Sequence, residues 1–508
     1  MTLPVSGPTA PATPATAPPV RARRWATAGV VILAMLVATA AWLPFLDRPL
    51  SADESGFLML AQQWWPGHSL YGDLWVDRPP LLVWLFAAAG NLGPGGATAT
   101  GFVAPGVKIL GALASATSVG LAGVLASLVS PTRRGRIACV VLAAALLSSP
   151  LLAMPEVNGE LLAVPFVLAG LVCLIVALRG SWGWRTAGLA VGAGAAGMAA
   201  ALVKQNVLDV FVFAAVLVVV SFGHVPRLGR RVAAFAGGAI TVLGAALAGA
   251  WAHGTSAAGL WDAVVTFRGQ ASEVINASAS SATLLRGAEL VAASVVSGVA
   301  VLLVVAVAAI LTHRTRLAWP ALALTAWEVF GIAAGGSYWL HYLTGIVPGL
   351  VLLVAIAPPR AGRALTRAVA YTVAVTLTVW TYRVASPPPP SPEAQVSTYL
   401  REHAHSSTDG VVVGFGHPEI VAASGQYSAY EYLWSLPVRV RDPELNRLHS
   451  VLAGPSAPRW VVVDGGSLDS WGLNADDAQQ YLVRHYVERV NYDNWHVWER
   501  RGPEGTRR

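Results

Sequence analysis

The chain has 508 residues, of which 55% are hydrophobic and only 12% are charged. Soluble globular proteins have roughly 25% charged residues, so this composition excludes a water-soluble globule. The 34 Lys and Arg residues exceed the 27 Asp and Glu residues, but they gather in short loops beside apolar segments, which argues against a nucleic-acid partner. Cys139 and Cys173 both lie within apolar runs and predict buried thiols without a disulfide framework.

The chain begins with a segment too poor in large apolar residues to fold. Residues 1–24 are rich in Pro, Ala and Thr, end in three arginines, and predict a disordered cytoplasmic tail. The apolar run from Trp25 to Leu43 is too long for the apolar region of a signal peptide, and no clean cleavage site follows it. We therefore expect a retained first span.

Apolar segments of membrane-crossing length recur along the next 340 residues. A helix needs about 20 apolar residues to cross the hydrocarbon. Together with the first span they predict eleven crossings, the other ten near 105–129, 137–153, 161–178, 186–203, 207–222, 232–251, 286–311, 317–334, 341–357 and 366–383.

Five short loops between these segments are basic and predict the orientation of the chain. They contain Arg133, Arg134 and Arg136; Arg179 and Arg185; Arg227, Arg230 and Arg231; His313, Arg314 and Arg316; and Arg360, Arg363 and Arg367. All five fall in alternate loops, so the positive-inside rule places them in the cytoplasm, and it places the opposite loops and everything after residue 384 outside the plasma membrane.

One apolar segment is too short for this pattern. Residues 79–90 are apolar, but Asn91, Gly93 and Pro94 interrupt them after about three helical turns. A full crossing here would move every later basic loop to the outside. We interpret the segment as a re-entrant or embedded helix, which is tolerated where it is buried against protein. A twelfth crossing is the alternative.

The C-terminal quarter has an ordinary charge content. Residues 385–392 form a Pro-rich linker, and residues 393–508 predict a small soluble domain outside the membrane. Within it, 411–415 and 460–463 predict buried strands, and 443–452 and 475–485 predict helices. The expected fold is an all-α polytopic membrane domain over 25–384 with a small α/β extracytoplasmic domain after it.

The first outer loop, about residues 47–101, is far longer than ordinary connections and carries a distinctive set of residues. These are Asp53-Glu54, Tyr71-Gly72 and Asp77-Arg78-Pro79-Pro80-Leu81. This pattern resembles the first-loop signature of GT-C glycosyltransferases, in the branch that contains the dolichyl-phosphate-mannose–protein mannosyltransferases and the lipid A aminoarabinose transferase. Arg78 stands where Lys is common in that branch. The resemblance covers roughly residues 25–350 and extends to Lys204-Gln205-Asn206 and to residues 337–342.

The resemblance implies transfer of a sugar, with inversion, from a polyprenyl-phosphate donor to a cell-envelope glycan, lipid or protein acceptor. Asp53 is then the general base that removes the acceptor proton, with Glu54 as second choice. The alternative for Asp53 is an N-cap of the helix that follows. Arg78 is expected to contact the lipid phosphate, or else to act as an interface anchor.

Other residues near the outer ends of spans are weaker candidates. Lys204 is expected to bind phosphate or sugar, or else to snorkel to the interface. His341 and Tyr342 are candidates for the same contact, the alternative being a purely structural histidine. Glu156 or Glu160 is expected to supply a second acidic residue, or else to be solvated. A final candidate for a phosphate contact is Arg268, in an outer loop over 252–285 that is expected to cover the cleft.

No cofactor is certain from the sequence. Outer-loop carboxylates are compatible with a divalent metal ion, but no ligand set converges, so the metal site is left open. A transporter or flippase for a lipid-linked sugar would explain the spans and the cations, although not the long first loop. A non-catalytic relative that binds a cell-wall partner is the other alternative.

Overall fold

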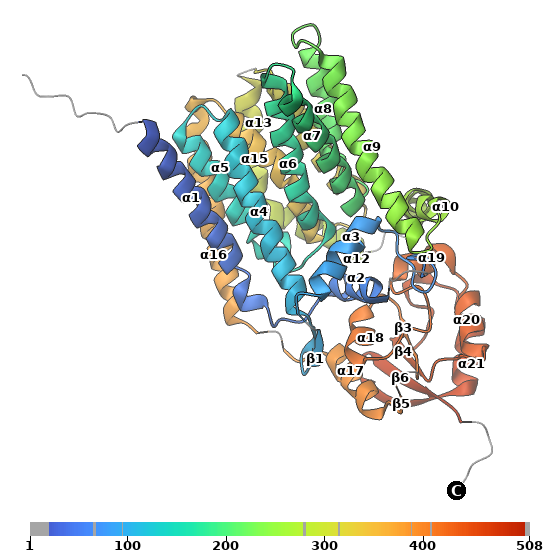
Figure 1. The fold of residues 1–508 in the computed structure, drawn as a ribbon. Helices are drawn as coiled ribbons and strands as arrows, with labels where there is room; N and C mark the ends of the chain where they lie inside the picture. The colour runs from blue at the N-terminus through green and yellow to red at the C-terminus, as the bar shows by residue number, and fades with distance from the viewer. Residues whose placement is uncertain are drawn as a thin grey trace, which may run out of the picture.

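The computed structural model describes residues 20–63, 68–93, 95–277, 281–312, 315–387, 389–406 and 409–502. Of the tail predicted over residues 1–24, residues 1–19 lie outside the described residues. Helix α1 (Val20–Ala40) includes the rest of it. The chain forms a bundle of apolar helices with a smaller unit of helices and a sheet at one end (Figure 1).

A helix forms at every segment for which a crossing was predicted. After α1 these are α4 (Pro105–Val129), α5 (Arg133–Leu147), α6 (Gly159–Arg179), α7 (Trp184–Val203), α8 (Asp209–Ser221), α9 (Leu228–Ala252), α12 (Ser281–Val296), α13 (Val299–Leu311), α14 (Ala318–Ala334), α15 (Val347–Ile356) and α16 (Gly362–Ala385). In the described part of the chain, five helices are long and apolar enough to cross a membrane, or seven if two bent pairs each count as one span. The chain is therefore a membrane protein, and the count of eleven crossings stays a prediction.

Two predicted spans are not the continuous helices that the sequence predicts. The segment 286–311 divides into α12 and α13, which meet at 63° around Ser297 and Gly298. Gly298 has a φ of +84°, a conformation that ends the helix and costs glycine little. The segment 341–357 begins as a 3₁₀ helix, η4 (Leu340–Ile346), before α15.

Close helix packing in the bundle depends on small residues. A Cβ added to Gly194 in α7 would lie 1.9 Å from the Phe235 carbonyl oxygen of α9, and one added to Gly238 in α9 would lie 2.0 Å from the Val191 carbonyl oxygen of α7. The two backbones therefore touch, as is common between membrane helices, where apolar burial alone does not favour association.

The long first loop is folded. Its helices are α2 (Ala52–Gln63) and α3 (Pro80–Gly90), followed by a hairpin of β1 (Gly96–Thr98) and β2 (Gly101–Val103). α3 has eleven residues, and whether it is embedded or makes a twelfth crossing stays a prediction.

The C-terminal unit contains a four-stranded sheet in the order β3-β4-β6-β5. Its elements are α17 (Pro392–His403), β3 (Val411–Gly414), α18 (Pro418–Ser424), α19 (Ser435–Arg441), α20 (Asn446–Ala453), β4 (Trp460–Asp464), α21 (Asp476–His485), β5 (Tyr486–Tyr492) and β6 (Trp495–Arg500). β3 and β4 are parallel, whereas β6 is antiparallel to both of its neighbours. The two strands and two helices expected from the sequence are present, while β5 and β6 were not predicted because charged residues alternate with their apolar ones.

Three distant parts of the chain share one hydrophobic core beside this sheet. Trp75 of the first loop packs on Phe267 with ring centroids 4.6 Å apart and on Tyr432 at 6.0 Å. Phe267 begins α11 (Phe267–Ala277), which follows α10 (Ala257–Trp261) and a π-helical turn (Asp262–Thr266). The first loop, the α10–α11 segment and the C-terminal unit are thereby held together at one end of the bundle.

Candidate functional site

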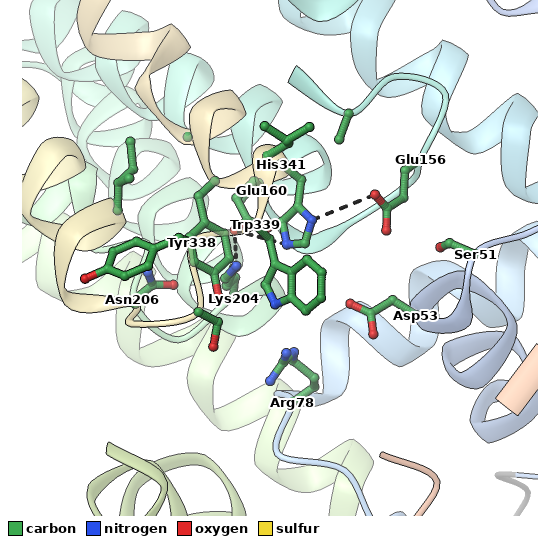
Figure 2. Close-up of a pocket in the computed structure, with 18 of the residues that line it drawn as sticks. Ser51, Asp53, Arg78, Glu156, Glu160, Lys204, Asn206, Tyr338, Trp339 and His341 are labelled. Carbon is green, nitrogen blue, oxygen red and sulfur yellow. Dashed lines mark hydrogen bonds and ion pairs between the residues drawn. The ribbon is translucent and has the colours of Figure 1, made fainter. Parts of the chain in front are cut away.

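A cavity of about 1040 Å³ lies where the first loop, the adjacent ends of the membrane helices and the C-terminal unit meet. Its lining includes all the site residues that the sequence singled out: Asp53, Glu54, Arg78, Glu156, Glu160, Lys204, Arg268, His341 and Tyr342. Figure 2 shows side chains from α2, from the loop before α3 and from η4 directed into this common space. Residues as far apart in the chain as Asp53 and Tyr342 therefore form one site.

Two adjacent carboxylates, Asp53 and Glu54, lie in the first turn of α2 and make different contacts. Ser51 and Glu54 cap the helix reciprocally, because the Ser51 amide donates to Glu54 Oε2 at 2.8 Å and the Glu54 amide donates to Ser51 Oγ at 3.3 Å. The N-cap alternative for Asp53 is therefore wrong, and Ser51 has that role. Asp53 is left in the first turn with its side chain toward the cavity (Figure 2).

The Glu54 carboxylate is buried, and both of its oxygens accept hydrogen bonds. It accepts hydrogen bonds from Lys108 Nζ at 2.6 and 2.8 Å and from the Val157 amide at 2.8 Å. Lys108 also donates to the Pro155 carbonyl at 2.9 Å. Glu54 and Lys108 are only 1% exposed, so they form a buried ion pair that joins α2, α4 and the loop before α6.

Asp53 is positioned as a carboxylate with access to the cavity. Its Oδ1 accepts a hydrogen bond of 2.9 Å from the indole Nε1–H of Trp434, from the C-terminal unit. Burial raises the pKa of Asp53; the Arg78 charge opposes this rise, and the nearby Glu156 carboxylate adds to it. The net shift of the Asp53 pKa is upward, which makes its carboxylate a stronger base than an exposed one.

Arg78 is held by a buried carboxylate beside it. Asp77 Oδ1 accepts from Arg78 at 2.5 Å, and its Oδ2 accepts from Arg268 at 2.6 Å. The Tyr71 hydroxyl donates to the Arg78 carbonyl at 2.9 Å, and Gln205 Nε2 donates to the Asp77 carbonyl at 2.9 Å. Burial by itself raises the pKa of Asp77, but the two guanidinium groups outweigh it and the net shift is downward.

The remaining predicted residues form a second polar cluster across the cavity. Lys204, at the end of α7, is ion-paired with Glu160 in the first turn of α6, and its ammonium lies 4.8 Å from the Tyr342 ring centroid. His341 stands between two carboxylates, 3.8 Å from Glu156 and 3.9 Å from Glu160 (Figure 2). Glu160 is 6% exposed, so the solvated alternative is wrong for this residue.

Several cavity residues were not predicted as part of the site. Lys108 had a signal in the sequence, since only it and Lys204 are lysines among the basic residues. Trp434 and His417, the latter hydrogen-bonded to Glu419 at 2.8 Å, had none, because only the docking of the C-terminal unit brings them to the cavity. Asp209 and Glu328, buried carboxyls on α8 and α14, also line the cavity.

The metal site left open by the sequence has no candidate ligand set in this part of the chain. Among the described residues, no three His, Cys, Asp or Glu side chains come together in an arrangement that would hold an ion.

No protein-family model matches the sequence, and no curated protein sequence matches it. Solved structures do match the fold. The chain is similar to ArnT from Cupriavidus metallidurans bound to undecaprenyl phosphate, with a TM-score of 0.57 and 13% identity over 94% of this chain and 98% of that one. It is also similar to the archaeal oligosaccharyltransferase AglB from Archaeoglobus fulgidus in complex with an inhibitory peptide and a dolichol-phosphate, with a TM-score of 0.56 and 12% identity over 87% of this chain and 70% of that one. Both are GT-C glycosyltransferases, so the resemblance expected from the first-loop motif is confirmed at the level of the fold. The fold of this chain is therefore similar to that of these two GT-C glycosyltransferases.

Proposed function

We propose that the protein is an inverting glycosyltransferase that moves a sugar from a polyprenyl-phosphate donor to an acceptor outside the membrane. The observation that carries this proposal is the convergence of Asp53, Arg78 and Lys204 on one cavity in a chain with the GT-C fold. The two solved neighbours are bound to a dolichol-phosphate and to undecaprenyl phosphate, which supports this class of donor.

In the proposed reaction, Asp53 is the general base. An acceptor hydroxyl attacks the anomeric carbon and passes its proton to the Asp53 carboxylate. The bond between that carbon and the phosphate oxygen breaks, and the phosphate leaves with the electron pair. Glu54 is less suited to be the base because Lys108 and the Val157 amide already occupy its oxygens.

Arg78 and Lys204 are the proposed contacts of the leaving phosphate. Negative charge grows on the phosphate as the bond breaks, and positioned cations stabilise it most where water is excluded. Asp77 holds Arg78 on one side of the cavity, while Lys204 lies opposite with Tyr342 and His341. Glu156 and Glu160 are proposed to orient His341 and Lys204 rather than to react.

The proposal predicts that Asp53→Asn abolishes transfer. Detergent-purified protein is incubated with a panel of radiolabelled polyprenyl-phosphate sugars and a cell-envelope extract, and incorporation into the acceptor is counted. Loss of a general base lowers the rate roughly 10²- to 10⁴-fold. The matched control is Asp47→Asn, which changes an exposed aspartate in the same loop outside the cavity and is expected to leave transfer unchanged.

Two outcomes would contradict the proposal. Full activity of Asp53→Asn would remove the base assignment. Carrier-lipid movement between the leaflets of a proteoliposome, without incorporation of sugar from any donor, would instead support the flippase alternative.

A further inference from the structure

One wall of the cavity comes from the C-terminal unit rather than from the membrane helices. Its residues are Phe415, Gly416 and His417 after β3, and Trp434, Ser435, Leu436, Pro437 and Arg439 at the start of α19. Trp434 is the member of this wall that hydrogen-bonds to Asp53, at 2.9 Å. Because 381 positions separate the two residues in the chain, this contact exists only while the C-terminal unit is docked on α2.

The shape of α2 at this point is adapted to the indole. A Cβ added to Gly56 would lie 2.3 Å from Trp434 Cζ2 and 2.7 Å from its Cη2, so any larger residue would displace the ring. The neighbouring Phe57 packs against the same indole with ring centroids 5.5 Å apart. The indole therefore lies on α2 one turn from Asp53, and its N–H has a fixed direction.

The segment before Trp434 is anchored to the first loop as well. The Trp75 amide donates to the Glu431 carbonyl at 3.0 Å, and Trp75 and Tyr432 form a β-bridge. The first loop thus holds the C-terminal unit at two points, one of which touches the proposed base. Any movement of the unit away from α2 would separate the indole from the carboxylate.

We propose that Trp434 is a positioning residue for Asp53, and that docking of the C-terminal unit thereby controls whether the proposed base is aligned. This inference rests on the proposed function. A hydrogen bond from a fixed donor orients one carboxylate oxygen and leaves the other directed at the acceptor. An acceptor or partner that moves the C-terminal unit would switch the reaction through this single contact.

Kinetics of Trp434→Phe test the proposal. Phenylalanine keeps an aromatic ring on Gly56 and removes the N–H. We expect kcat to fall about 10- to 100-fold with the donor KM unchanged, as befits the loss of one hydrogen bond to a charged group. The matched control is Trp498→Phe, which makes the same change in β6, outside the cavity. We expect its kcat to equal that of the wild type.

The pH profile gives a readout that a purely structural role would not move. The groups that act on Asp53 besides Trp434 are Arg78, Glu156 and His341, and the variant leaves all three in place. The N–H favours the ionised form of Asp53, so its removal raises the pKa of that carboxyl. Since the base must be ionised to react, the acidic limb of the profile should move to higher pH by about one unit.

A measurement without turnover separates this inference from the proposed function. A water-soluble carbodiimide with glycine ethyl ester modifies protonated carboxyls, and peptide mass spectrometry gives the pH at which half of Asp53 reacts. We expect that midpoint to rise in Trp434→Phe but not in Trp498→Phe. If it rises while wild-type protein transfers no sugar, the contact stands and the proposed function fails. If the midpoint and kcat both match those of the control variant, the positioning role is overturned.

Discussion

Two adjacent carboxylates on α2 differ because of what surrounds each of them. Glu54 is buried beside Lys108, and every charge buried in this way needs a partner to offset its lost hydration. Asp53 has one hydrogen bond to a neutral indole and faces the cavity. A carboxylate therefore joins three elements at Glu54, whereas the carboxylate of Asp53 faces the cavity.

Asp77 holds two arginine side chains in place at the cavity. Its carboxylate holds both Arg78 and Arg268, and its lowered pKa keeps it ionised throughout the neutral range. The stabilisation from these contacts is present above the ordinary carboxyl pKa and is lost only as the pH falls through the lowered value.

We expect Asp77→Asn to lower kcat/KM for the lipid-phosphate donor about 10- to 100-fold, because Arg78 loses the charge that fixes it. Steady-state kinetics at varied donor concentration would measure the change. Asp73→Asn serves as the control, since this aspartate lies in the same loop, is 63% exposed and pairs only at the surface with His68. A donor KM and kcat equal to those of the control would show that Arg78 is positioned without Asp77.

At the scale of elements, α14 and α15 meet through a polar contact that a glycine allows. The Glu328 carboxyl of α14 accepts a hydrogen bond of 2.9 Å from the Gly349 amide of α15. A Cβ at Gly349 would lie 2.1 Å from Glu328 Oε2 and 2.6 Å from Thr325 Oγ1. The absence of a side chain at Gly349 therefore allows the two helices to come together beside the cavity.

Gly349→Ala is expected to destabilise the protein by about 1–3 kcal/mol, because the added methyl group overpacks this contact. Thermal unfolding in detergent, followed by loss of helical circular dichroism, would give the change in midpoint. Gly244→Ala in α9 is the matched control, as nothing lies within 4 Å of the added Cβ, and helix propensity predicts a neutral or slightly stabilising effect. Equal midpoints for the two variants would contradict the prediction.

At the scale of the whole molecule, the basic loops between α4 and α5, between α6 and α7 and between α8 and α9 lie at the opposite end of the bundle from the C-terminal unit (Figure 1). His313 and Arg314 of the fourth predicted basic loop lie outside the described residues. Arg231 donates to the Ala177 and Gly180 carbonyls, and Arg179 donates to the Leu128 carbonyl, so three basic loops meet at one end. α18 packs on α2 and the β1–β2 hairpin at the other end. This separation supports our proposal that the C-terminal unit and the cavity face outward while the N-terminus and the basic loops are cytoplasmic.

Single cysteines test this orientation. In a background where Cys139 and Cys173 are replaced by alanine, Ala97→Cys in the hairpin should react with a membrane-impermeant maleimide on intact cells. Pro131→Cys in the loop between α4 and α5 should react only after permeabilisation, although it is also exposed. Labelling in the reverse order would overturn the proposed topology.

Apolar length alone predicted where the helices of the bundle lie, because the backbone groups of a helix in a membrane must bond within the segment. The first-loop resemblance pointed to Asp53 and Arg78, and the scarcity of lysine pointed to Lys204; the structure places all three at one cavity, while their roles stay predictions. The tertiary structure decided what spacing cannot encode. It broke the span 286–311 at Gly298, paired Glu54 with Lys108, and brought Trp434 onto Asp53. Those outcomes depend on which surfaces pack together, since a buried charge or a directed hydrogen bond takes its role from partners that lie far away in the chain.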